Sequence, residues 1–159
     1  LLSVQAQPVA ENHEEFQSYY EKVLDLVVQS SKQVVTVTPA IVGEKIDNTS
    51  NNEIKELNIL IQSITSKYSN VSFIDIQSAF INHLLEVNSS DYISTKVLSV
   101  MMDVLFYKKP SKIDKKSKER GLHLTLDGIH LNSTGAQLVA DIYAAKIEHF
   151  LENEHHEVQ

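Results

Sequence analysis

Two short stretches rich in branched aliphatic residues alternate with segments of helical periodicity, and this alternation constrains the fold more than any other feature. The stretches cover residues 33–38 and 71–76, and both have the composition of buried strands. A helical apolar pattern precedes, separates and follows them. The order helix, strand, helix, strand, helix favours a parallel sheet covered by helices, so the predicted fold class is α/β.

Capping boxes predict where two of the helices begin. Asn12 with Glu15 predicts a helix that reaches about residue 31, and Ser50 with Glu53 predicts a second that reaches about residue 68. The remaining patterns predict a strand within residues 1–7, helices from residue 78 and within residues 90–107, and a last helix from about residue 133.

Composition excludes several classes of function. The 159 residues suggest one domain, and the absence of cysteine excludes disulfides, a thiolate nucleophile and cysteine-ligated metals. The net charge of −7 repels phosphate backbones, so nucleic acid is not an expected partner. No stretch approaches the roughly 20 apolar residues of a membrane span, and no signal peptide is visible. We therefore expect a soluble protein, with the cytoplasm as the favoured compartment.

Two charged segments are expected to lie outside the packed core. Residues 108–121 carry seven basic side chains beside Pro110 and Gly121, and we interpret them as a solvated basic loop. An acidic substrate, an anionic lipid or a phosphate is the alternative ligand for this loop. Residues 154–159 form an acidic tail that is expected to fray, and its neighbouring histidines alone do not predict a metal site.

Asp127 and His130 are the residues that point to chemistry. They lie three positions apart across Gly128, so a tight turn lets the carboxylate accept the proton on one imidazole nitrogen. The other nitrogen is then free to act as a base toward a nucleophilic hydroxyl from elsewhere. The alternative is a turn in which the aspartate only caps the next helix. We interpret Asp75 and His123 as structural.

The string from Asp127 to Asn132, Asp-Gly-Ile-His-Leu-Asn, is followed by Gly-Ala and an amphipathic helix. It resembles the last conserved block of the SGNH, or GDSL-type, hydrolase family. Residues 37–45 and 73–76 are similar to the family's later βα units. The resemblance implies a three-layer α/β/α fold like that of flavodoxin, and hydrolysis of esters or related acyl bonds by a serine nucleophile without metal or organic cofactor.

The resemblance also implies residue roles. His130 would be the general base and Asp127 its orienting partner. The expected substrate is a small-molecule, lipid or carbohydrate ester.

The sequence departs from the family pattern near its start. The Gly-Asp-Ser block that supplies the nucleophile is absent, so we expect this chain by itself to be inactive. Ser3, Gln5 and Ala6 fall where the family has Gly-x-Asn-Asp, which makes Gln5 a candidate oxyanion donor, although its side chain is one methylene longer than asparagine. The alternative for Gln5 is a polar residue at a strand end.

Two βα units of the family have no counterpart in the sequence. We therefore expect a truncated or rearranged member, or one piece of a longer polypeptide, that could self-associate through an exposed sheet edge. The alternative function is a non-catalytic binding module that keeps the SGNH scaffold.

Overall fold

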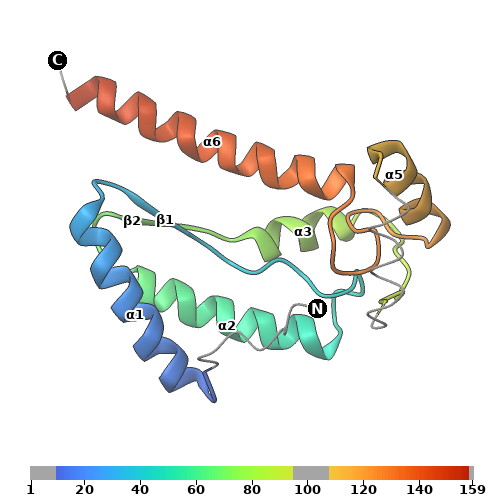
Figure 1. Ribbon diagram of the computed structural model, residues 1–159, viewed down its shortest axis with the longest axis horizontal. Helices are drawn as coiled ribbons and strands as arrows, with labels where there is room; N and C mark the ends of the chain where they lie inside the picture. The colour runs from blue at the N-terminus through green and yellow to red at the C-terminus, as the bar shows by residue number, and fades with distance from the viewer. Residues whose placement is uncertain (1–9, 95–107, 158–159) are drawn as a thin grey trace. The chain divides into compact units, whose positions relative to one another are not determined.

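The computed structural model describes residues 10–94 and 108–157 (Figure 1). These residues divide into two compact units. The first comprises residues 10–39 and 53–75, and the second comprises the described residues of 40–52 and 76–157. One domain spanning residues 1–159 stays a prediction.

The first unit contains the sheet. Helix α1 (His13–Ser30) leads to strand β1 (Val34–Val37), and helix α2 (Thr49–Thr65) connects it to strand β2 (Val71–Ile74). The strands pair in parallel with Val34 opposite Val71 and Val37 opposite Ile74, and a parallel pair requires such a crossover helix. Both helices lie on the same side of the strands (Figure 1). The predicted α/β class is confirmed, with two strands in the sheet of the described residues.

Branched apolar side chains bury the inner faces of these elements. Leu24 of α1, Ile61 and Ile64 of α2, and Ile74 of β2 are all buried. A polar contact accompanies them, because the hydroxyl of Thr36 lies 3.1 Å from that of Thr65. Strand β1 and helix α2 are thus joined by a hydrogen bond as well as by the chain.

The helix starts show which capping signals operate. The predicted cap of α1 is confirmed, since Asn12 Oδ1 accepts the Glu15 N–H at 2.9 Å. The predicted cap of α2 at Ser50 is wrong. Asn48 Oδ1 accepts the Asn51 N–H at 2.8 Å, and its amide nitrogen also donates to the carbonyl of Val42 at 2.8 Å. Asn48 prevails because it satisfies the preceding turn and the helix together.

The second unit contains helices α3 (Ile76–Leu84), α5 (Pro110–Glu119) and α6 (Ser133–Glu157). Helix α6 contacts both α3 and α5. Its start at Ser133 was predicted, and its end extends into the tail for which fraying was expected. Side chains of α3 and of the segment before α6 form the buried core here: Ile76, Phe80, Leu84, Leu122, Leu124 and Leu126.

The basic segment at residues 108–121 is not a loop, because most of it forms α5. Pro110 stands at the start of this helix, where its missing N–H costs nothing. The buried Ser117 faces inward, while Lys112, Lys115 and Lys118 are exposed. Exposed lysines on one face are compatible with a helix. The helical spacing was missed because the run of charges was interpreted as a solvated loop.

Two predicted elements fall outside the described residues. They are the strand within residues 1–7, with Gln5, and most of the helix expected within residues 90–107; the described part of the latter, residues 90–94, is not helical. Within the described ranges, no helix is long and apolar enough to cross a membrane.

Candidate active site

Residues 124–132 form a loop that folds back on itself before α6. An isolated antiparallel bridge joins Thr125 to Leu131 across this loop. Gly128 lies at its tip with φ of 90°, in the region that glycine adopts without steric cost. A Cβ on Gly128 would lie 2.9 Å from the carbonyl oxygen of Tyr92. The loop therefore requires glycine here both for its backbone angle and for space.

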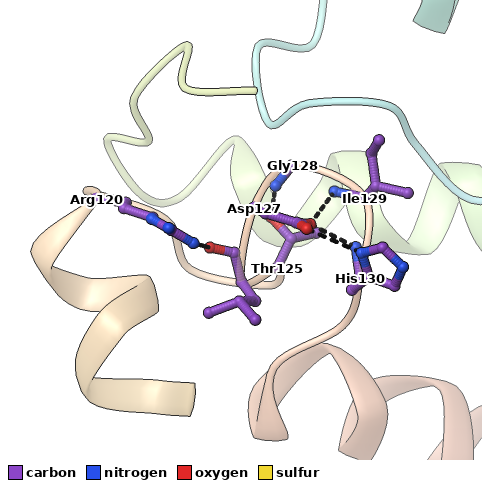
Figure 2. Close-up of polar contacts among 7 residues, drawn as sticks. Arg120, Thr125, Asp127, Gly128, Ile129 and His130 are labelled. Carbon is purple, nitrogen blue, oxygen red and sulfur yellow. Dashed lines mark hydrogen bonds and ion pairs between the residues drawn. The ribbon is translucent and has the colours of Figure 1, made fainter. Parts of the chain in front are cut away.

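The loop brings Asp127 and His130 into direct contact. Asp127 Oδ2 lies 2.9 Å from His130 Nδ1 (Figure 2). Asp127 Oδ1 accepts the backbone N–H groups of Ile129 at 3.0 Å and of His130 at 2.8 Å. The aspartate is fully buried, whereas the imidazole side chain is 53% exposed. The contact expected from the spacing is present, with a buried carboxylate behind a ring that reaches solvent.

The pKa of Asp127 favours an ionised carboxylate. Burial raises the pKa, but the hydrogen bonds from the backbone and ring of His130 and from the backbone of Ile129 outweigh it, so the pKa of Asp127 lies below its ordinary value. An ionised Asp127 can only accept at Oδ2, so Nδ1 of His130 carries the proton in this contact. The lone pair of the neutral ring is then on Nε2, which has no hydrogen-bond partner among the described residues.

Glu44 is a part of this region that sequence reasoning missed. Its buried carboxylate accepts five hydrogen bonds from residues of the second unit. Oε1 accepts the N–H groups of Leu124 at 2.8 Å and Thr125 at 2.7 Å, and the hydroxyl of Thr125 at 2.8 Å. Oε2 accepts the N–H of His123 at 2.7 Å and the hydroxyl of Ser89 at 2.8 Å. The available signal was a carboxylate directly after the apolar run of residues 39–43.

Helix α5 supports the other side of the same loop. Ser117 Oγ lies 2.6 Å from the carbonyl oxygen of Thr125 and accepts the side-chain amide of Asn132 at 2.7 Å. Arg120 Nη1 donates to the carbonyl of Leu126 at 2.9 Å (Figure 2). Part of the basic segment is therefore structural, because it satisfies buried carbonyls of the loop that carries His130.

The other residues considered from the sequence are not part of the contact between Asp127 and His130, or they lie outside the described residues. The ring of His123 has its Nε2 3.3 Å from the carbonyl oxygen of Asn88, in keeping with a structural interpretation. Gln5 has no described position. In the described part of the chain, no serine or threonine hydroxyl hydrogen-bonds the imidazole of His130. Within the described residues, the structure brings Asp127 and His130 together with no hydroxyl bonded to the ring.

Among the comparisons with known proteins, only the solved structures give matches. No model of a protein family matches the sequence, and no curated protein matches it. The crystal structure of the acetyl xylan esterase AlAXEase matches with a TM-score of 0.59 and 22% identity, over 89% of this chain and 58% of the esterase. An α/β hydrolase from the metagenome of Lake Arreo, Spain, matches with a TM-score of 0.56 and 16% identity, over 84% of this chain and 46% of the hydrolase.

The chain thus spans about half the length of the solved structures that it resembles. At these identities the likeness concerns the fold alone. The chain has an α/β fold that resembles the folds of an esterase and of an α/β hydrolase.

Proposed function

We propose that this chain carries the base and the orienting carboxylate of an SGNH-type ester or acyl hydrolase. The single observation that supports this most is the 2.9 Å contact between buried Asp127 Oδ2 and Nδ1 of the half-exposed His130. Asp127 does not cap α6, because Asn132 Oδ1 accepts the Gly135 N–H there at 3.0 Å. The resemblance in fold to an esterase supports the same reaction class.

The proposed reaction uses both nitrogens of the ring. Nε2 of His130 takes the proton of a serine hydroxyl while the serine oxygen attacks the ester carbonyl carbon. The resulting imidazolium is stabilised by Asp127 and gives that proton to the departing alkoxide, which leaves an acyl-enzyme. Water then attacks the acyl carbon, His130 takes its proton, and the serine leaves with that proton as the acid is released.

We propose that the nucleophilic serine belongs to a Gly-Asp-Ser block, which these 159 residues do not contain. No described hydroxyl occupies the position next to His130, and the solved structures of similar fold are longer than this chain. The complete fold would be a three-layer α/β/α sandwich acting on a small-molecule, lipid or carbohydrate ester. No metal or organic cofactor takes part in this proposal.

Hydrolysis of a short-chain aryl ester tests the proposal. A polypeptide that joins this sequence to a serine-bearing βα segment should turn over the ester, and so should the two parts expressed together. His130→Ala should abolish turnover. Asp127→Asn should reduce kcat by about 10⁴-fold, because an amide nitrogen facing Nδ1 favours the tautomer with its proton on Nε2.

His149→Ala is the matched control. This histidine lies on the exposed surface of α6, so its removal should leave turnover unchanged. Full activity of His130→Ala in the joined polypeptide would refute the proposed base. Turnover by the 159-residue chain alone would refute the external serine.

A further inference from the structure

Three consecutive backbone N–H groups converge on the carboxylate of Glu44. They belong to His123, Leu124 and Thr125, at 2.7, 2.8 and 2.7 Å from its oxygens. Successive N–H groups of this kind form a concave site for an anion, and here the anion is a side chain of the same chain. Glu44 is about 80 residues away in sequence, so it fixes this segment by tertiary contact.

The hydroxyl of Thr125 links Glu44 to Gly128 at the tip of the loop. Thr125 is fully buried, and its only hydroxyl proton goes to Glu44 Oε1 at 2.8 Å. A lone pair of the same oxygen accepts the backbone N–H of Gly128 at 3.1 Å. A carboxylate oxygen that accepts the hydroxyl proton polarises the hydroxyl and makes its oxygen a better acceptor for the Gly128 N–H.

The residue before Glu44 holds the same tip from its other end. The N–H of Gly43 donates to the carbonyl oxygen of Gly128 at 2.6 Å. Both backbone groups of Gly128 are therefore held by residues 43–44, one directly and one through Thr125. Gly128 sits between Asp127 and the backbone N–H groups that its carboxylate accepts.

We propose that Glu44 is a positioning residue for His130, acting through the hydroxyl of Thr125 on the turn that joins Asp127 to the imidazole. Glu44 takes no part as a base, because it is buried and both its oxygens are occupied by donors. Its effect on turnover rests on the proposed function. Its effect on the geometry of the His130 ring does not.

Nuclear magnetic resonance of the 159-residue chain measures that geometry without any assay of activity. The nitrogen shifts of His130 report which ring nitrogen carries the proton, and the Nδ1–H resonance reports its bond to Asp127. Thr125→Val keeps the shape of the side chain and removes the hydroxyl. We expect the ratio of Asp127-bound to unbound rings to fall by about fivefold, the equivalent of one net hydrogen bond. Thr125→Ser keeps the hydroxyl and should retain the bound ring.

Thr36→Val is the matched control, because it removes another buried threonine hydroxyl that bonds only within the first unit. It should leave the His130 resonances unchanged. A Thr125→Val protein that folds and keeps an unchanged His130 ring would overturn the proposal.

The unsubstituted chain offers a test that does not depend on a variant folding. We call the hydrogen bonds that run from Glu44 through the Thr125 hydroxyl to the Gly128 N–H the relay. The relay predicts slow exchange with solvent for both the Thr125 hydroxyl proton and the Gly128 amide proton. Fast exchange of either proton would also overturn it.

The joined, active polypeptide separates this proposal from the proposed function. If Thr125→Val lowers the fraction of His130 rings bound to Asp127 in that polypeptide, and kcat falls while KM stays, the relay and the proposed function are both supported. If the ring shifts and kcat does not, the relay stands and the role of His130 as the base fails.

Discussion

Replacing Gly128 by alanine should destabilise the loop that carries His130 through two separate effects. At φ of 90°, a residue with a Cβ loses about 1–2 kcal/mol relative to glycine. The new Cβ would also lie 2.9 Å from the carbonyl oxygen of Tyr92 and 3.2 Å from the Cα of Ile93. Both are backbone atoms that cannot rotate away, and such overpacking costs about 1–3 kcal/mol. Alanine restricts the unfolded chain, which offsets about 0.4–1 kcal/mol of this loss.

We therefore expect the free energy of unfolding of Gly128→Ala to fall by about 1–4.5 kcal/mol. Urea denaturation followed by circular dichroism measures this change. The variant should still fold in water, because natural domains are stable by about 5–15 kcal/mol.

Gly121→Ala is the matched control, with a similar backbone effect and a milder contact. Gly121 also has a positive φ, of 69°, but the atoms nearest to its added Cβ are the Cβ and Oγ of Ser90, at 3.2 and 3.5 Å. The change in the unfolded chain is the same in both variants, so the difference between them measures the additional clash at Gly128. Gly128→Ala should be less stable than Gly121→Ala by about 1–3 kcal/mol. Equal losses in the two variants would refute the argument that the close approach at Gly128 matters.

Three further predictions concern the same unit. The lowered pKa of Asp127 makes its ionised form stabilising above the unfolded pKa, and this stabilisation is lost as pH falls through the folded pKa. Between about pH 7 and about pH 3, urea titrations should therefore show a smaller loss of unfolding free energy for Asp127→Asn than for the unsubstituted chain. Equal losses would contradict this. Asn132→Ala removes both the cap of α6 and a buried amide donor, so unfolding should become easier by about 1–3 kcal/mol, with Asn132→Asp in between because it keeps the cap oxygen. Gly135→Ala places a Cβ against the carbonyl oxygen of Leu124 and should cost at least about 2 kcal/mol in the same assay, whereas a neutral result would show that the start of α6 can shift freely.

Local signals predicted well where the partners lie within a few residues. Asn12 caps α1 because the N–H that it accepts lies three residues away, a distance that the capping box specifies. The same signal failed at Ser50, because Asn48 makes contacts with the turn around Val42 that no local pattern contains. The lysine-rich α5 was missed as a helix because its charged sequence has no apolar stripe, and the bonds of its buried Ser117 to the neighbouring loop are contacts that no local pattern contains.

By itself the sequence predicted the α/β order of elements and, with a helix cap as the alternative, the contact between Asp127 and His130. The second was predicted from a spacing of three residues across a glycine, which lets a tight turn bring the two side chains together. Only the tertiary structure decided what holds that contact in place. Glu44 accepts hydrogen bonds from the loop although it lies about 80 residues away in the sequence. A hydrogen bond across such a separation produces no local sequence pattern, because it depends on how the chain folds and not on which residues are neighbours in sequence.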